Sequence, residues 1–193
     1  MPFTLQIGQQ APDFDLPGID GRRHSLKDFA RAKVLVVFFT CNHCPFVLGS
    51  EDRILALHDR FHPRGVDWAG INSNETDNHP TDDVEHMKQR ARSEGIRYPY
   101  LRDESQEVAR AYGALRTPHF YVFDAARRLR YTGRLDDNPR EAAKATTHEL
   151  ADAIEAVLAG RRPPVELTNP IGCNVKWRGQ DPHWMPPEAC DLI

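Results

Sequence analysis

The pattern of apolar positions predicts alternating strands and helices along the chain. The longest apolar run, Val34–Phe39, is continuous, β-branched and aromatic, which is typical of a strand buried on both faces of a parallel sheet. Apolar residues then recur at helical spacing from Phe46 to Phe61, so we predict a helix there. Pro45 fits its first turn, where a missing N–H costs nothing. The stretch 65–72 predicts a second strand.

The rest of the pattern continues this alternation. Helices are predicted at 80–92, 105–112 and 146–158, and strands at 120–123 and 129–133. Because strands alternate with helices, we expect an α/β protein, and a hairpin formed by the last two strands makes its central sheet mixed.

Turn and proline signals divide the chain into parts. Asp20-Gly21 predicts a small hairpin near the N-terminus. From Arg161 onward prolines crowd the sequence, which indicates irregular backbone. We therefore expect a domain over residues 1–160 with an N-terminal hairpin extension, and a proline-rich tail over 161–193 packed on it.

Composition restricts the class of protein. The chain has 193 residues, 25 Lys+Arg against 28 Asp+Glu, a net charge of -3 and 40% hydrophobic residues. This is too apolar for a disordered chain and too balanced in charge for a dedicated nucleic-acid binder. The N-terminus lacks the basic start and the following apolar run of a secretory signal. No apolar run in the sequence is long enough to cross a bilayer. We expect a cytoplasmic protein without nucleic-acid or membrane partners.

The four cysteines are distributed unevenly. They stand at positions 41, 44, 173 and 190, too few for a disulfide-stapled scaffold. Cys41 and Cys44 form a C-x-x-C between a predicted buried strand and a predicted helix. Helix N-terminal N–H groups stabilise an anion, and only the thiolate attacks a disulfide. The two-residue spacer lets one thiol resolve a mixed disulfide formed by the other. The pair therefore indicates thiol–disulfide chemistry.

Several segments resemble one family. Gly8–Phe14, Thr40–Pro45 and Thr117-Pro118 are similar to the thioredoxin-fold redoxin superfamily, in its branch related to alkyl hydroperoxide reductase and thiol-specific antioxidant proteins. Residues 103–109 and 171–177 resemble a narrower subfamily of thioredoxin family proteins. The resemblance covers nearly the whole chain. It implies a thioredoxin-like fold of peroxiredoxin type and an oxidoreductase that requires no metal or organic cofactor.

The resemblance also implies roles for individual residues. Cys41, as the first and more exposed thiol, would attack a protein or small-molecule disulfide, and Cys44 would be the buried resolving thiol. A thiol reductant would then restore the pair. His43, inside the motif, would stabilise the reduced thiolate. We therefore expect a reduction potential above the roughly -270 mV of thioredoxin, toward the roughly -180 mV of disulfide isomerase.

A second loop is expected beside the redox pair. The family places a cis-proline there, so we predict a cis bond between Thr117 and Pro118. This loop would hold an extended substrate peptide beside Cys41. Arg116 would add a positive charge nearby.

The chain departs from its relatives around the first cysteine. Thr40 stands where thioredoxin has a tryptophan. Peroxiredoxins carry Thr-x-x-Cys, and here Cys41 occupies the threonine position while Cys44 occupies that of the peroxide-reacting cysteine. This departure argues against efficient peroxidase activity, which stays an alternative.

Other functions of the cysteines stay open. Cys41, His43, Cys44 and Cys173 are a possible zinc set, but structural zinc sites usually show two close ligand pairs and only one is present. A metal- or protein-binding module whose redox pair no longer turns over is the corresponding alternative. We expect Cys173 to be a buried packing residue, with a third redox thiol as the alternative. Cys190 is expected to be an exposed thiol.

Overall fold

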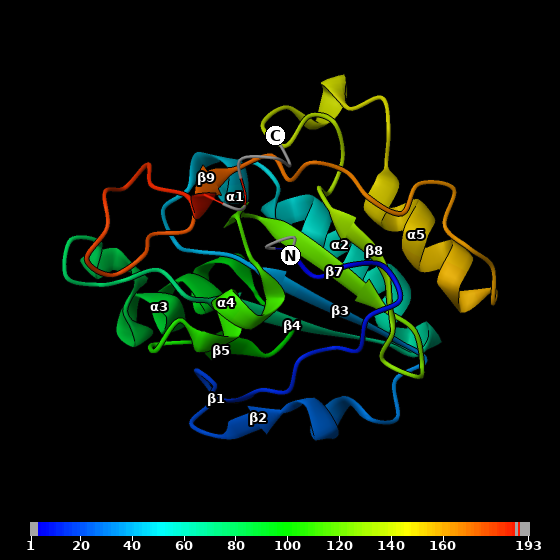
Figure 1. Cartoon of the computed structure of the whole chain (residues 1–193), viewed down its shortest axis with the longest axis horizontal. Coiled ribbons are helices and arrows are strands. Elements are labelled where there is room, and N and C mark those ends of the chain that lie inside the picture. The colour runs from blue at the N-terminus through cyan, green and yellow to red at the C-terminus, as the bar shows by residue number, and fades with distance from the viewer. Residues whose placement is uncertain (1–3, 188, 190–193) are drawn as a thin grey trace.

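A five-stranded sheet forms the middle layer of the molecule, a computed structural model that describes residues 4–187 and 189 (Figure 1). Its strand order is β5-β4-β3-β7-β8. The central strand β3 pairs parallel with β4 and antiparallel with β7, so the predicted mixed α/β sheet is confirmed. The strands of this sheet are β3 (Val34–Phe39), β4 (Val66–Asn72), β5 (Tyr100–Arg102), β7 (His119–Phe123) and β8 (Leu129–Gly133).

Helices and two small sheets surround this layer. The helices are α1 (Pro45–Leu48), α2 (Glu51–Phe61), α3 (Val84–Glu94), α4 (Glu107–Tyr112) and α5 (Glu149–Leu158). The small sheets pair β1 (Asp15–Pro17) with β2 (Arg23–Ser25) and β6 (Arg116–Thr117) with β9 (Cys173–Asn174). The β1–β2 pair is the predicted N-terminal hairpin.

Strand β3 explains why both faces of the sheet are covered. All six of its residues are fully buried, and burial of one such side chain contributes about 1.5–3 kcal/mol. Alternate residues of a strand point to opposite faces. Val34, Val36 and Phe38 pack in the cluster that includes residues of α2 and α5, whereas Leu35, Val37 and Phe39 pack in the other cluster.

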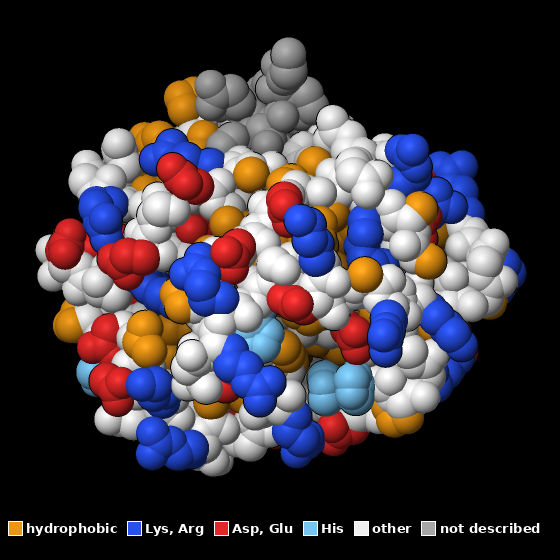
Figure 2. Space-filling view, turned by 90° about the horizontal axis from the view of Figure 1, so that it is seen from below, with side chains coloured by type: hydrophobic (Ala, Val, Ile, Leu, Met, Phe, Trp, Pro, Cys, Tyr) orange, Lys and Arg blue, Asp and Glu red, His pale blue; other side chains and the backbone are white. Residues whose placement is uncertain are grey.

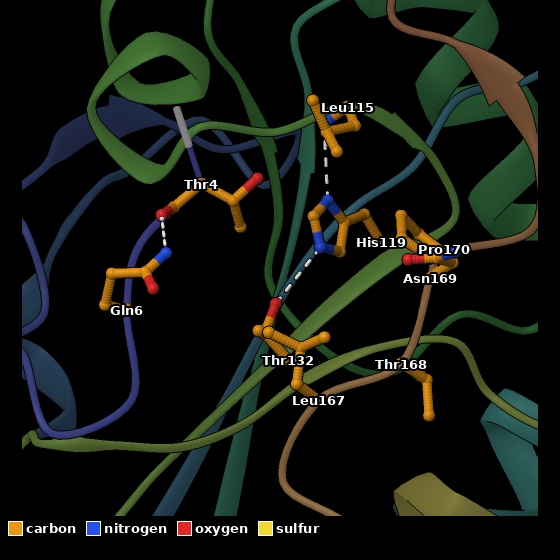
Figure 3. A pocket seen from close by; sticks show the side chains of 9 residues that line it. All are labelled: Thr4, Gln6, Leu115, His119, Thr132, Leu167, Thr168, Asn169 and Pro170. Carbon is orange, nitrogen blue, oxygen red and sulfur yellow. Dashed lines mark hydrogen bonds between the residues drawn. The ribbon is translucent and has the colours of Figure 1, made fainter. Parts of the chain in front are cut away.

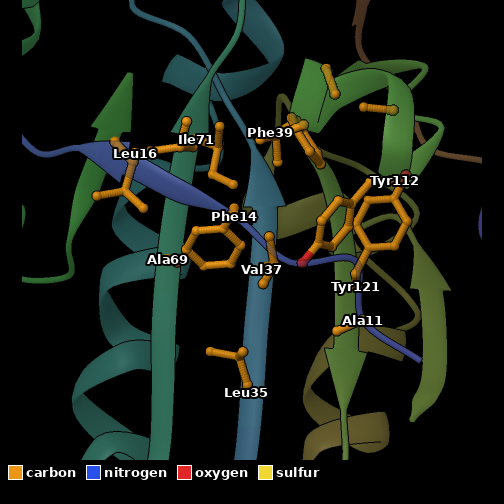
Figure 4. Packing of buried hydrophobic residues seen from close by; sticks show 14 of the residues in the cluster. Ala11, Phe14, Leu16, Leu35, Val37, Phe39, Ala69, Ile71, Tyr112 and Tyr121 are labelled. Carbon is orange, nitrogen blue, oxygen red and sulfur yellow. The ribbon is translucent and has the colours of Figure 1, made fainter. Parts of the chain in front are cut away.

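The second cluster joins distant parts of the chain. Figure 4 shows Phe14, from the segment before β1, beside Val37 of β3, and Tyr112 of α4 beside Tyr121 of β7. Trp177 of the C-terminal segment belongs to the same cluster. The C-terminal segment therefore packs on this face of the sheet through Trp177.

Several predicted boundaries differ from the structure. The helix expected over 46–61 is divided at Gly49 and Ser50, where an added Cβ on Gly49 would lie 2.8 Å from the carbonyl oxygen of Pro139. The helix expected to begin at Thr146 begins at Glu149, because Thr146 and Thr147 instead donate their N–H groups to Asp137.

The surface has a mixed character. On the face drawn in Figure 2, basic and acidic side chains interleave, with small apolar areas between them. Among the described residues, no helix combines the length and apolar character that a membrane span requires.

Candidate functional site

The C-x-x-C motif lies between β3 and α1, as predicted. Thr40 continues the strand by donating its N–H to the carbonyl oxygen of Ile71 at 2.9 Å. Cys44 is the residue just before α1, and Pro45 occupies the first position of that helix. The loop 40–44 is therefore fixed by the sheet at one end and by the helix at the other.

The Thr117–Pro118 loop meets both cysteines. The peptide bond between these residues is cis, as predicted. The Sγ atom of Cys41 lies 3.3 Å from Oγ1 of Thr117, and the Cys44 thiol donates to the Thr117 carbonyl oxygen at 3.2 Å. Thus segments more than 70 residues apart in sequence form one site.

Burial of the cysteines corrects the prediction that Cys41 is exposed. Cys41 is 1% exposed and Cys44 is 0% exposed. Strand β9 of the tail pairs with β6, and Cys173 packs against the cluster that Cys41 and Cys44 form with Val47. The tail packs against these cysteines at the helix start, where exposure was expected. This course of the tail is not predictable from local sequence.

The two thiols also differ in pKa, opposite to the sequence-based roles. The pKa of Cys44 lies well below its ordinary value because the thiols of Cys173 and Cys41 donate to its sulfur. These bonds, with N–H donors from Cys173 and Val47, outweigh the effect of burial. Burial raises the pKa of Cys41, and donation to Cys44 raises it further. Of the two thiols, Cys44 is therefore the one that loses its proton more readily.

His43 is paired with a carboxylate that the sequence did not single out. Its Nδ1 atom lies 2.9 Å from Oδ2 of Asp82, in the turn before α3. The side chain of His43 is 33% exposed, whereas that of Asp82 is fully buried. Contact with Asp82 raises the pKa of His43. Although burial opposes ionisation of Asp82, its bonds to His43 and to the N–H of Asn42 lower its pKa.

The Asp82 carboxylate also holds the redox loop in place. It accepts the N–H of Asn42 at 2.7 Å and side-chain amides of Asn72 at 3.1 Å and Asn74 at 2.8 Å. Tyr100 donates to the Asn42 side chain at 2.8 Å. In the sequence Asp82 is one of several acids at the start of a predicted helix, and no local signal distinguishes it from Asp83.

A second histidine–carboxylate pair flanks the first. The His79 ring stacks on that of His43, with centroids 5.4 Å apart and an interplanar angle of 13°. Nδ1 of His79 lies 2.5 Å from Oε1 of Glu75. The partly exposed side of the site is thus formed by two imidazoles, each with its own carboxylate.

Possible metal ligands form a different set from the predicted one. Ligand atoms of Cys41, His43 and Asp82 lie within 4.8 Å of one another. The Asp82 carboxylate already accepts three N–H groups and contacts an imidazole. We interpret this arrangement as a buried ion pair that orients His43.

Arg116 contacts the tail. Its Nη1 atom donates to the carbonyl oxygen of Gly172 at 3.1 Å and to Oδ1 of Asn174 at 2.9 Å. An added Cβ on Gly172 would lie only 2.1 Å from the Thr117 carbonyl oxygen. Cys173, predicted to be buried, is partly exposed and contacts the redox pair. Cys190 lies outside the described residues.

His119 is the first residue of β7, directly after the cis-proline, and has a different environment. It pairs in register with Phe39 at the end of β3. Figure 3 shows its ring in a small pocket between the Leu115 backbone and Thr132. Its Nδ1 accepts the Leu115 N–H at 3.3 Å and its Nε2 lies 3.0 Å from Oγ1 of Thr132. Burial, with the charge of Arg116, lowers its pKa to about 3, so it is neutral.

Comparison with known proteins gives relatives at two levels. The model of the AhpC/TSA family matches residues 7–132. The hypothetical protein SMc02350 of Sinorhizobium meliloti is 35% identical with a TM-score of 0.87, covering 92% of this chain and 97% of that one. An uncharacterized conserved protein of Geobacillus kaustophilus is 38% identical with a TM-score of 0.86, covering 93% and 96%. At this coverage both likenesses include most of the C-terminal region that the family model leaves out.

A curated relative carries a functional name. The thiol-disulfide oxidoreductase ResA of Geobacillus thermodenitrificans is 27% identical over 123 residues, which are 63% of this chain and 65% of that protein. The match thus spans slightly less than two thirds of the relative. At this identity it supports a relationship to redox proteins at the level of the superfamily.

Proposed function

The chain belongs to the AhpC/TSA family, and from this premise we propose that it is a thiol–disulfide oxidoreductase whose redox pair is Cys41 and Cys44. The observation that supports this most directly is the position of both thiols between α1 and the cis Thr117–Pro118 loop. This places two sulfurs and a polar backbone edge together, as disulfide exchange requires.

In the proposed reaction the pair moves between dithiol and disulfide. A thiolate of the pair attacks a sulfur of the substrate disulfide, and the other substrate sulfur leaves as a thiolate. The second cysteine then displaces the bound sulfur, so two electrons pass to the substrate and Cys41–Cys44 forms. The pKa directions favour Cys44 as the attacking sulfur, whereas the sequence assigns that role to Cys41.

Catalysed reduction of insulin by dithiothreitol, with Cys41→Ser and Cys44→Ser variants, tests the function and the roles. We expect the wild type to exceed the rate of dithiothreitol alone and both variants to lose most of this excess. The Cys44→Ser variant should fall to the uncatalysed rate if Cys44 attacks first. A wild type no faster than dithiothreitol, or a fully active Cys44→Ser variant, would overturn the proposal.

A thiol peroxidase is the second candidate, and one observation favours it. Cys44, at the position of the peroxide-reacting cysteine, is the sulfur whose pKa is lowered. Its thiolate would attack a peroxide oxygen, giving a sulfenic acid and an alcohol or water, and Cys41 would then form the disulfide with release of water. Peroxide consumption exceeding insulin reduction, and lost in Cys44→Ser, would select this candidate.

A further inference from the structure

The tail segment that carries Cys173 is held against the redox loop from two sides. On one side β9 pairs antiparallel with β6, so that Cys173 lies opposite Thr117, and Arg116 bonds the residues on either side of it. On the other side Lys176 donates its N–H to Oδ1 of Asn74 at 2.9 Å, and its carbonyl oxygen accepts the N–H of Glu75 at 2.9 Å. The position of Cys173 is therefore determined by backbone pairing.

This position brings a third sulfur to the centre of the site. Cys44 donates to the carbonyl oxygen of Thr117 at 3.2 Å, and Cys173 is the residue that pairs with Thr117 across the β6–β9 ladder. Cys173 packs against the buried cluster that Cys41 and Cys44 form with Val47. Figure 1 shows β9 beside α1, where these segments meet.

Access to solvent distinguishes the three sulfurs. Cys41 and Cys44 are 1% and 0% exposed, whereas Cys173 is partly exposed. A surface groove lined by Phe46, Arg116 and Ile171 runs beside Gly172, next to this cysteine. An external thiol or disulfide that meets the site in this conformation encounters Cys173 first.

We propose that Cys173 is a third redox thiol that carries the disulfide between the buried Cys41–Cys44 pair and thiols in solution. In the oxidised protein the Cys173 thiol gives its proton to solvent, and its thiolate attacks Sγ of Cys44. The Cys44–Cys173 bond forms as the Cys41–Cys44 bond breaks, and Cys41 leaves as a thiolate that takes up a proton. One disulfide is exchanged for another, with no net oxidation.

An external thiol then completes the cycle. Its thiolate attacks Sγ of Cys173 and releases the Cys44 thiolate, and a second external thiol displaces Cys173. The external thiols are oxidised to a disulfide and the protein returns to three thiols. This step extends the proposed function and rests on it, because Cys41 and Cys44 must first be oxidised.

The surroundings of Cys173 change with the redox state in the direction that this transfer needs. In the reduced protein, donation to Cys44 is the largest cause that raises its pKa, followed by burial. Once Cys44 is part of a disulfide, its negative charge is gone and this cause is removed. The positive charges of Lys176 and Arg140, which lower the pKa of Cys173, remain.

Disulfide mapping tests the transfer with the full chain in a Cys190→Ser background, which leaves three thiols. The protein is oxidised with oxidised glutathione, blocked with N-ethylmaleimide and digested with trypsin without reduction. Cys41 and Cys44 fall in one tryptic peptide, 34–53, and Cys173 falls in another. A cross-linked pair of peptides therefore reports any disulfide to Cys173, and a loop within 34–53 reports Cys41–Cys44.

Single variants identify the partner of Cys173. We expect the cross-link in the parent protein and in Cys41→Ser but not in Cys44→Ser, and the internal loop in Cys173→Ser. Reduction of the oxidised protein by glutathione should be roughly tenfold slower or more in Cys173→Ser, because the remaining disulfide is buried. Protein with all four natural cysteines is the control for Cys190→Ser, and its rate should match that of the parent.

The outcomes separate this inference from the proposed function. If Cys41–Cys44 forms normally but the parent and Cys41→Ser give no cross-link, the third-thiol role is wrong and the redox pair stands. If no protein forms either disulfide, the proposed function itself fails. The Cys41→Ser result does not depend on whether a Cys173 variant folds.

Discussion

His43 and His119 both lie beyond or beside the same end of β3, but their partners shift their pKa values in opposite directions. His119 pairs with Phe39 at the end of β3, and His43 follows four residues beyond that strand residue. The Asp82 carboxylate raises the pKa of His43, whereas burial among neutral groups and the charge of Arg116 lower that of His119. The partner of each imidazole, rather than its position beside the thiols, therefore decides the direction of its pKa shift. Only a histidine with a raised pKa can provide a positive charge for the redox pair.

The His119→Leu variant tests whether the buried His119 stabilises the fold. This change leaves the N–H of Leu115 without its acceptor and removes the partner of Thr132. We expect the free energy of unfolding to fall by about 3 kcal/mol, measured by urea denaturation. His86→Leu, at an exposed position, is the control and should change it by less than about 0.5 kcal/mol. An equal loss in both would refute a structural role for His119.

The raised pKa of His43 depends on its contact with Asp82. In Asp82→Asn the buried amides of Asn72 and Asn74 meet a neutral partner and His43 loses its counter-charge. We expect about 2 kcal/mol of lost stability and a lower pKa of His43, followed by NMR titration of its ring protons.

Asp83→Asn provides the matched control for that variant. Asp83 accepts the N–H of His86 at the start of α3 and is exposed to solvent at its side chain. It should cost about 1 kcal/mol or less and leave the titration of His43 unchanged. If both variants shift the His43 titration equally, the pairing with Asp82 is not its cause.

The two histidines should also give stability a pH dependence of opposite sign. For His119 both states are neutral above the ordinary pKa of 6.5, and between 6.5 and about 3 only the unfolded state gains the proton. As the pH falls through this window, the contribution of His119 therefore lowers the free energy of unfolding by about 1.4 kcal/mol per pH unit. For His43 the folded state binds the proton more tightly. Its stabilisation is complete below pH 6.5 and is lost as pH rises through the raised pKa.

Urea denaturation at a series of pH values, with His119→Leu and His43→Gln, separates these contributions. The acid loss should be shallower in His119→Leu than in the wild type. The decline on the alkaline side should be shallower in His43→Gln. Identical pH profiles for the wild type and either variant would contradict the corresponding assignment.

The smallest expected effect is on the reduction potential. The charge of Cys44 raises the pKa of His43, so by reciprocity protonated His43 stabilises the Cys44 thiolate of the reduced protein. In His43→Gln we expect a potential lower by about 30 mV, which is about tenfold in equilibrium with glutathione. His79→Gln, which removes the stacked ring without touching Asp82, should change it less. A higher potential in His43→Gln would reverse the role of the imidazole.

Much of the fold could be predicted because its signals are local. The continuous apolar run of β3, the placement of the C-x-x-C after it and the Asp20-Gly21 hairpin were all visible in short windows of sequence. The resemblance supplied the cis bond before Pro118. These features depend on near neighbours or on one recognisable motif, so they are predictable from the sequence.

The rest of the site depends on contacts between distant segments. The position of Asp82 behind the redox loop and the pairing of Thr117 with Cys173 have no local signature. Each follows from where a loop or tail passes over the finished sheet. The expected exposure of Cys41 was wrong for the same reason, because Cys41 is buried.

Gly172 has a consequence that reaches beyond its own contacts. With the Thr117 carbonyl oxygen 2.1 Å and the Pro118 nitrogen 3.1 Å from where a Cβ would stand, the two backbones leave no space for even a methyl group. We expect Gly172→Ala to push the tail away from the Thr117–Pro118 loop. This substitution would change no sulfur and no charge of the site. The close packing of the tail against the redox pair thus depends on a residue that has no side chain and takes no part in the chemistry.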